Sequence, residues 1–279
     1  MAGVEAYAIG EWLDSLLPIM PRRDSPMRLG RILVDGKPEY CLVEDGRVRI
    51  IEGDLFESFQ PSDRVLEMTD IQPISPVTPS KIIAVGLNYR DHADEMEEEL
   101  PKEPLIFLKP PTAVIGPGEM IVIPTGAGRV DYEAELAIVM GKKGRHIPVG
   151  EARRYILGYT CLNDVTAREL QAKDGQWTRA KSFDTFCPIG PWIATDFEPG
   201  SLQIQLYLNG QCKQESNTNQ LIFNVDQLVS HISSIMTLLP GDVIATGTPS
   251  GVGALADGDI VQVVIEGLGV LENRVVNEG

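Results

Sequence analysis

The chain has 279 residues, of which 43% are hydrophobic and 23% are charged, and its formal net charge at pH 7 is -16. This length suits one large domain with or without a small one, and no stretch approaches the roughly 20 consecutive apolar residues of a membrane-spanning helix. The negative charge argues against nucleic acid and membrane surfaces as partners, because phosphate groups are bound through clustered Lys and Arg. An acidic protein that acts on small anions needs a cation at its site to reverse the local field.

The first segment and the cysteines both indicate a cytoplasmic protein. Residues 1–26 carry apolar side chains at the spacing of one helix face, which predicts a docked amphipathic helix, and they lack the basic start of a secretory signal. The cysteines lie far apart, without the paired spacing of a zinc site or the density of a disulfide scaffold. We therefore expect reduced, structural thiols at Cys41, Cys161, Cys187 and Cys212.

A small β-rich N-terminal domain is the next expected unit. Residues 27–66 contain short alternating stretches separated by two Asp-Gly pairs, which are strong hairpin signals. The following segment, TDIQPISPVTPSK at 69–81, carries three prolines in a polar background and suits an extended linker. We therefore expect a small domain over residues 1–75, including the N-terminal helix, and a larger one over 76–279.

The larger domain is expected to be mainly β, within an α+β fold class. Short apolar runs recur between Gly and Pro residues, and helical patterns are few. The strands do not alternate regularly with helices, which favours a closed or folded-over mixed sheet over a doubly wound sheet or a βα barrel. The expected strands are 82–85, 105–108, 121–123, 202–208, 243–245 and 260–265, and the expected helices are 91–100, a segment from 151, a short one after 164, and 225–239.

An acidic strand is the strongest feature of this domain. The sequence VDYEAEL at 130–136 runs into apolar AIVM, which predicts one strand with Asp131, Glu133 and Glu135 on the same face. Like charges along one face destabilise a strand unless a cation compensates them. The spacing alone fits a solvated acidic face and a metal site about equally well.

A second source of carboxylate favours the metal site. Asp164 lies in LNDVTARELQ, where a strand ends and a short helix begins, which is also an ordinary N-cap position. Two glutamates and one aspartate, completed by water and substrate oxygens, suit a hard cation such as Mg²⁺, with Mn²⁺ or Ca²⁺ as alternatives. We therefore expect Glu133, Glu135 and Asp164 to be metal ligands.

One histidine has the spacing of a general base. In NYRDHADEM, Glu95 follows His92 by three residues and shares its face if the segment is helical. A histidine oriented by a carboxylate is the usual form of a general base, although the spacing by itself is better explained by an exposed acidic helix in which His92 is idle. Lys109 and Lys181 each follow an apolar stretch and could be partly buried beside a site, or be ordinary surface lysines.

Six segments together resemble the fumarylacetoacetate hydrolase family in order and spacing, over residues 81–279. They are NYRDHADEM, LIFLKP, VDYEAELAIVMGK, GYTCLNDVTARELQ, WTRAKSFDTFCPIGPW and LLPGDVIATGTPSGVG. The resemblance implies a mixed β-roll catalytic domain, usually a homodimer, preceded by a small N-terminal domain in many bacterial members. Larger members carry an additional aspartate ligand, and PPTAVIG at 110–116 offers no clear counterpart.

The resemblance also implies roles for individual residues. Glu133, Glu135 and Asp164 match the metal ligands of the family, and His92 with Glu95 matches its water-activating pair. Lys181 corresponds to the lysine of the site. Contacts to the substrate are expected from Lys109, Arg168, Gln171 and Thr248.

The implied function is Mg²⁺-dependent chemistry on small 2-oxo or 1,3-diketo acids through an enolate. We expect carbon-carbon hydrolysis of an acylpyruvate or fumarylpyruvate, in which His92 deprotonates water and a pyruvate enolate leaves, or oxaloacetate decarboxylation. Isomerisation of 2-hydroxyhepta-2,4-diene-1,7-dioate and hydrolysis of a diketo sugar acid stay open. An idle oxo-acid binding protein is the alternative of another class. Residues 91–100 are hypothesised to be a lid that orders on the substrate.

Overall fold

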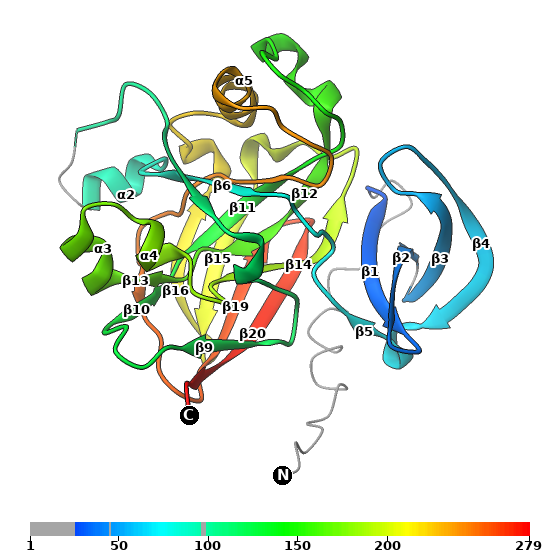
Figure 1. Cartoon of the computed structure of the whole chain (residues 1–279), viewed down its shortest axis with the longest axis horizontal. Coiled ribbons are helices and arrows are strands. Elements are labelled where there is room, and N and C mark those ends of the chain that lie inside the picture. Colours follow the sequence, from blue (N-terminus) through cyan, green and yellow to red (C-terminus); the bar gives the residue numbers. More distant parts are fainter. Residues whose placement is uncertain (1–25, 45, 96–98) are drawn as a thin grey trace.

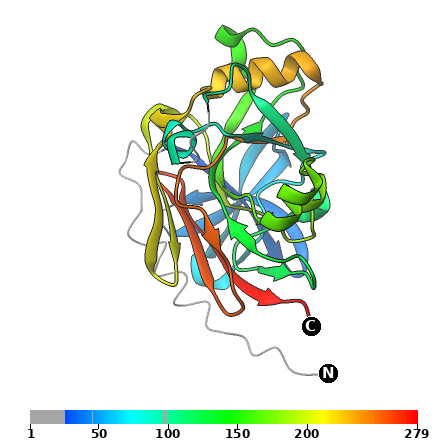
Figure 2. The same cartoon turned by 90° about the vertical axis from the view of Figure 1, so that its left-hand side faces the viewer.

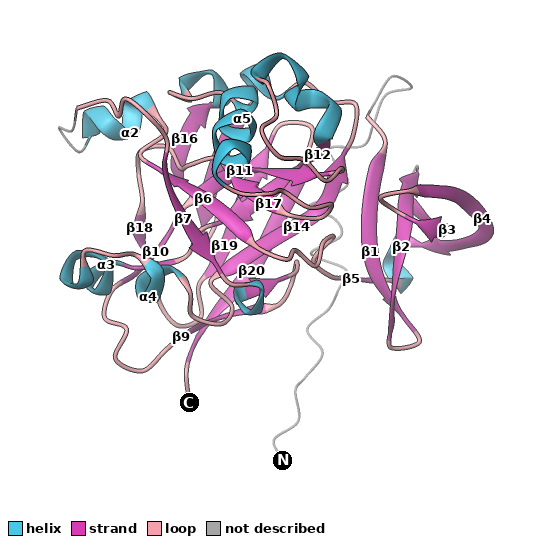
Figure 3. Ribbon diagram, turned by 45° about the horizontal axis from the view of Figure 1, so that its top comes forward, coloured by secondary structure: helices cyan, strands magenta, loops and turns pink. Residues whose placement is uncertain are grey.

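The computed structural model describes residues 26–44, 46–95 and 99–279. The helix expected within residues 1–26 lies outside the described part. Strands dominate the described residues, and the short helices α2 (Arg90–Glu95), α3 (Arg168–Asp174) and α4 (Thr178–Lys181) lie on the side of the molecule away from the N-terminal strands (Figure 1; Figure 3). The expected α+β, mainly β fold class is therefore confirmed.

The N-terminal strands form an antiparallel meander. Asp35 and Gly36 both adopt positive φ, 50° and 74°, as a tight two-residue hairpin requires. The first strand also pairs with a strand of the larger unit, and Trp192 from that strand lies against Gly30, where a Cβ would come within 2.4 Å of the indole ring. The strands are β1 (Arg28–Val34), β2 (Lys37–Glu44), β3 (Arg47–Asp54), β4 (Ser58–Glu67) and β5 (Gln72–Pro73).

The largest sheet runs from these strands through the centre of the molecule. Its order is β4-β3-β2-β1-β14-β12-β11-β17-β6-β7, and it is mixed because β17 pairs with β6 in parallel. Its central strands are buried throughout, since both of their faces are covered. The added strands are β6 (Ile82–Gly86), β7 (Leu105–Lys109), β8 (Val114–Ile115), β11 (Ala134–Met140), β12 (Ile156–Asn163), β14 (Cys187–Ala194) and β17 (Val243–Ala245).

Two smaller sheets complete the β structure. A five-stranded sheet, β16-β15-β19-β20-β9, packs on β11, β12 and β14, and its β15–β16 and β19–β20 hairpins lie side by side in Figure 2. A three-stranded sheet has the order β13-β10-β18. These strands are β9 (Met120–Ile123), β10 (Val130–Tyr132), β13 (Thr166–Ala167), β15 (Gln203–Leu208), β16 (Gln211–Asn217), β18 (Gly253–Ala254), β19 (Ile260–Ile265) and β20 (Gly269–Asn277).

The helices are short, and three differ from the sequence expectation. The helix expected over 225–239 ends at Ile235, because Leu238 instead pairs with Gly144. The segment from 151 is a 3-10 helix, and the helix expected over 91–100 begins one residue earlier, with residues 96–98 outside the described part. The helices are α2 (Arg90–Glu95), α3 (Arg168–Asp174), α4 (Thr178–Lys181) and α5 (Val225–Ile235), with 3-10 turns η2 (Met68–Asp70), η3 (Pro111–Ala113), η4 (Val149–Tyr155), η5 (Pro199–Ser201) and η6 (Thr218–Gln220).

Within the described residues, no helix combines the length and the apolar character needed to cross a bilayer.

Candidate metal centre and active site

The acidic segment is broken at Glu133, which corrects the expectation of one continuous strand. β10 ends at Tyr132 in the three-stranded sheet, and β11 begins at Ala134 in the central sheet. At the break, the Glu133 amide donates to Asn163 Oδ1 over 2.9 Å and the Ala134 amide donates to Gln214 Oε1 over 2.9 Å. Side-chain acceptors therefore replace strand partners where the chain passes from one sheet to another.

The break separates Asp131 from the other two carboxylates. Asp131 accepts hydrogen bonds from Arg129 Nε over 2.6 Å and from Arg168 Nε over 2.9 Å. Glu133 and Glu135 instead meet Asp164, which follows β12, and ligand oxygens of these three residues all lie within 4.8 Å of one another. The structure thus brings together the three predicted metal ligands.

The three carboxylates are almost completely enclosed, with exposed fractions of 6% for Glu133, 1% for Glu135 and 1% for Asp164. Burying so many carboxylates demands compensating positive charge. Lys181 Nζ lies 2.8 Å from Glu133 Oε2 and 2.6 Å from Asp164 Oδ2, and Lys109 Nζ lies 2.5 Å from Asp164 Oδ1. Both lysines are themselves buried, so the alternative of ordinary surface lysines is wrong.

Among the described residues, the positive side chains pair with Glu133 and Asp164 but not with Glu135. Burial alone raises the pKa of Glu133, but the nearby Lys181 and Arg168 outweigh it and lower that pKa to about 2. Burial, followed by repulsion from Asp164 and Glu133, holds the pKa of Glu135 well above its ordinary value. Glu135 accepts a hydrogen bond from the Gly247 amide over 2.7 Å, and no Lys or Arg of the described residues pairs with it.

This donor set fits a divalent cation. All of its donors are carboxylate oxygens, which hard cations such as Mg²⁺ prefer, and zinc ligands of the His or Cys type are absent from the described cluster. A cation beside Glu135 would also offset the repulsion that raises the pKa of that side chain. The buried triad could therefore hold a divalent metal.

A cavity of about 400 Å³ opens onto the carboxylates. One wall is aromatic, where Phe107 and Trp177 meet edge to face with ring centroids 5.2 Å apart. Trp177 also lies over Gly86, where a Cβ would come within 2.6 Å of the indole. The residues that line the cavity are Val85, Gly86, Leu87, His92, Phe107, Glu133, Glu135, Asp164, Arg168, Gln171, Ala172, Trp177, Lys181 and Thr248.

His92 lines this cavity from α2 and is therefore not on an exposed helix face. Its Nδ1 lies 3.2 Å from Glu95 Oε2, and its side chain is only 13% exposed. α2 is itself docked, because Arg90 donates to the Leu221 carbonyl over 2.9 Å and Glu95 accepts from the Gly251 amide over 3.3 Å. The predicted lid is thus packed against neighbouring loops over its described turns.

The expected substrate-binding residues take two different positions. Arg168, Gln171 and Thr248 line the cavity, and Arg168 Nη1 donates to Gln171 Oε1 over 2.7 Å. Lys109 does not line it, but lies on the buried side of Asp164 and also donates to the Val165 carbonyl over 3.4 Å. These contacts make Lys109 a charge partner of a metal-ligand candidate, and its expected contact with the substrate stays a prediction.

Several residues of the site escaped the sequence analysis. Asn163 and Gln214 cap the strand break, and Gly86 makes room for Trp177. A glutamine in an ordinary strand pattern carries no sequence signal of such a role, because its partners lie 80 and 34 residues away along the chain.

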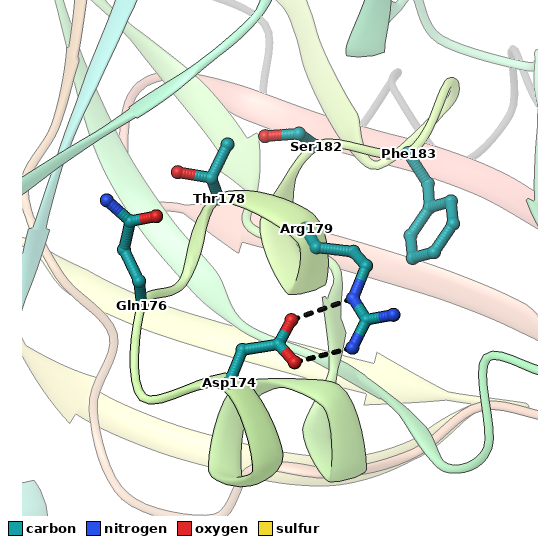
Figure 4. A pocket seen from close by; sticks show the side chains of 6 residues that line it. All are labelled: Asp174, Gln176, Thr178, Arg179, Ser182 and Phe183. Carbon is teal, nitrogen blue, oxygen red and sulfur yellow. Dashed lines mark hydrogen bonds and ion pairs between the residues drawn. The ribbon is translucent and has the colours of Figure 1, made fainter.

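A second and larger pocket, of about 580 Å³, lies at α3 and α4 (Figure 4). Its most polar feature is the ion pair of Arg179 with Asp174, at 2.7 Å and 2.5 Å, and the arginine side chain is 51% exposed. Exposed pairs of this kind contribute little energy and are screened by salt. The smaller cavity with the buried carboxylates is therefore the candidate active site.

The comparisons with known proteins agree with this geometry. The family model described as fumarylacetoacetate (FAA) hydrolase C-terminal matches residues 81–276, and the one described as Rv2993c-like N-terminal matches residues 27–76. An uncharacterized protein of Archaeoglobus fulgidus is 54% identical over 249 residues, which are 89% of this chain and 96% of that protein. A mitochondrial oxaloacetate tautomerase of Rattus norvegicus is 45% identical over 215 residues, 73% of this chain and 69% of that protein.

Solved structures give the same result. The crystal structure of 2-hydroxyhepta-2,4-diene-1,7-dioate isomerase from Mycobacterium marinum matches with a TM-score of 0.85 and 43% identity, over 91% of this chain and 99% of that one. The first family model covers most of the chain, and the relatives match more than two thirds of it at well above 30% identity. The chain belongs to the fumarylacetoacetate hydrolase family.

Proposed function

We propose that this protein is a Mg²⁺-dependent enzyme that converts small 2-oxo acids through an enolate. Keto-enol tautomerisation of a 2-oxo diacid such as oxaloacetate is the reaction best supported. The observation that carries the proposal is His92, held by Glu95, facing the same cavity as the three carboxylates and Lys181. An imidazole and a cluster able to hold a cation are the two parts that enolisation requires.

The carboxylates Glu133, Glu135 and Asp164 would hold the cation. When bound, Mg²⁺ supplies a Lewis acid that stabilises negative charge on the oxygen of a 2-oxo acid. Lys181 is the positive group of the chain at the same place, and although burial alone lowers its pKa, Asp164 and Glu133 raise it, so the ammonium stays charged. Its charge adds to the stabilisation of a developing oxyanion.

His92 is the proposed proton carrier. Because the Glu95 carboxylate accepts the proton on Nδ1, the lone pair of the neutral imidazole lies on Nε2. In tautomerisation, Nε2 removes a proton from the carbon beside the oxo group, and the electron pair of that carbon-hydrogen bond forms the carbon-carbon double bond. The oxo oxygen takes up the negative charge and then a proton returned by the His92 imidazolium, which gives the enol and regenerates the base.

Carbon-carbon hydrolysis is the second candidate. The aromatic wall of Phe107 and Trp177 offers an apolar surface for an acyl group beside Lys181, whose Nζ lies 5.1 Å from the centre of the Phe107 ring. In this reaction, His92 would take a proton from water, and the hydroxide would attack the distal carbonyl of an acylpyruvate. The bond between that carbonyl carbon and the methylene carbon would then break, releasing a carboxylic acid and a pyruvate enolate, which takes a proton from the His92 imidazolium to give pyruvate. The sequence favoured this reaction or decarboxylation, whereas the names of the tautomerase and isomerase relatives favour proton transfer alone.

Absorbance of the enol in the ultraviolet separates these reactions. We would follow oxaloacetate, acylpyruvates and a 2-hydroxy-2,4-diene diacid, each with Mg²⁺ and with a chelator, and quantify pyruvate at the end. Mg²⁺-dependent decay of oxaloacetate enol without pyruvate supports tautomerisation, and pyruvate with a carboxylic acid from an acylpyruvate supports hydrolysis. Tight binding of these acids without any turnover would instead support the idle binding protein.

A further inference from the structure

Gln214 in β16 connects two parts of the site that are distant in sequence. Its side chain is 1% exposed, and its Oε1 accepts the amide proton of Ala134, the residue between Glu133 and Glu135. Its Nε2 donates to Thr248 Oγ1 over 2.9 Å and to the Pro249 carbonyl over 2.9 Å.

The orientation of this amide is fixed by partners that have one possible role each. The Ala134 N–H can only donate, so the atom facing it must be the amide oxygen of Gln214. The Pro249 carbonyl can only accept, so the atom facing it must be the NH₂ group. A flipped amide would lose both hydrogen bonds and set like groups against each other.

This orientation dictates the role of the Thr248 hydroxyl. Because Gln214 Nε2 donates to Thr248 Oγ1, the hydroxyl accepts on that side and its own hydrogen points elsewhere. Thr248 lines the cavity, and no acceptor among the described residues takes this hydrogen. The hydrogen is therefore available to an acceptor in the cavity.

We propose that Gln214 is a positioning residue that fixes the Thr248 hydroxyl as a hydrogen-bond donor to a carboxylate of the substrate. The inference rests on the proposed function, since it takes the ligand to be a 2-oxo acid. Gln214 does not touch the ligand and acts through Thr248. A buried amide with all partners in place costs no reorganisation when the anion binds.

The loop at residues 247–251, which carries Thr248, also contacts two other parts of the site. Gly247 donates to Glu135 over 2.7 Å, and Gly251 donates to Glu95 over 3.3 Å, so the loop touches both a metal-ligand candidate and the partner of the proposed base. Gly251 has φ of +92°, and a Cβ there would lie 2.4 Å from the Lys213 carbonyl. The loop thus packs directly on β16, and Gln214 donates hydrogen bonds to Thr248 and Pro249 in the middle of the loop.

The test measures oxalate binding by calorimetry in the presence of Mg²⁺, with Gln214→Leu, Thr248→Val and the double variant. Oxalate is chosen because it is a small planar dianion that presents the two adjacent oxygens of a 2-oxo acid. We expect each single variant to weaken oxalate binding about tenfold or more, as for a lost hydrogen bond to a charged group. The double variant should be no weaker than Thr248→Val within about twofold, because the effect of Gln214 on oxalate passes through that hydroxyl. The Mg²⁺ affinity of Gln214→Leu, measured without oxalate, reports any separate effect of the lost Ala134 hydrogen bond on Glu133 and Glu135.

Two controls keep the result interpretable. Gln205→Leu on the neighbouring β15, whose amide bonds Glu215 at the surface, should leave oxalate affinity unchanged. Thr248→Ser retains the hydroxyl and should restore most of the affinity lost in Thr248→Val. If Gln214→Leu does not fold, Gln214→Glu takes its place, because it keeps the acceptor for Ala134 and replaces the donor to Thr248. In the Thr248→Val background, Gln214→Glu should no longer lower the affinity for oxalate, apart from the effect of the added charge.

The outcomes separate the two proposals. Wild-type protein that binds Mg²⁺ but not oxalate would refute the proposed function, and this inference with it. Wild-type binding with effects of Gln214 and Thr248 that multiply in the double variant would refute the inference alone. Unchanged affinity in both Gln214 variants would refute it as well.

Discussion

Replacing His92 with Asn tests the proposed division of labour between proton transfer and metal binding. The amide fills part of the space of the imidazole but cannot exchange a proton near neutral pH. A positioned general base contributes about 10²- to 10⁴-fold to a rate, equivalent to about 2.7–5.4 kcal/mol of activation free energy. His92 is 13% exposed and held by Glu95 at 3.2 Å, so we expect a loss of turnover in this range.

Metal affinity should respond differently. In the part of the chain that the structure describes, His92 makes no hydrogen bond or ion pair with Glu133, Glu135 or Asp164, so its removal should change Mg²⁺ affinity by less than about threefold. The assay pairs enol absorbance kinetics with Mg²⁺ calorimetry on the same preparations. His231→Asn on α5, which does not line the cavity, is the matched control and should retain full turnover. Loss of Mg²⁺ binding together with turnover, or turnover within tenfold of the wild type, would refute the assignment of His92 as the base.

Four further predictions follow from the same contacts. Lys109→Met leaves the Asp164 carboxylate buried with one ammonium fewer, so the free energy of unfolding in urea with a chelator should fall by about 3–5 kcal/mol; a change below 1 kcal/mol would contradict a buried ion pair. Mg²⁺ at about 100 times its Kd should raise the free energy of unfolding by about 2.7 kcal/mol, and a chelator should abolish this increase. The increase should also be absent in a Glu135→Gln variant that no longer binds the ion. Gly86→Ala should raise KM more than it lowers kcat, because its Cβ would displace Trp177 from the cavity wall, and unchanged kinetics would contradict this. Burial raises the pKa of three of the thiols to about 12, so at pH 8 a thiol reagent should modify Cys212 alone in native protein and all four cysteines after unfolding.

The sequence by itself determined the class of fold and named the three carboxylates that meet in the candidate site. Strand positions such as 82–85 and 243–245 agree with β6 and β17 within a residue, because alternation, apolar runs and Gly or Pro punctuation act over a few neighbours. The pairing of His92 with Glu95 also followed from spacing within one helical turn. Local physics is sufficient for features of this kind.

The tertiary structure decided which groups neutralise and orient the site. The break at Glu133 depends on acceptors from Asn163 and Gln214, which lie 30 and 80 residues away, and no local pattern encodes them. Likewise, Lys109 and Lys181 follow similar apolar stretches, yet one lies behind Asp164 and the other lines the cavity. A buried charge is stabilised by whatever partner the fold brings within about 3 Å, and that distance is set by the packing of whole sheets and not by neighbours in the chain.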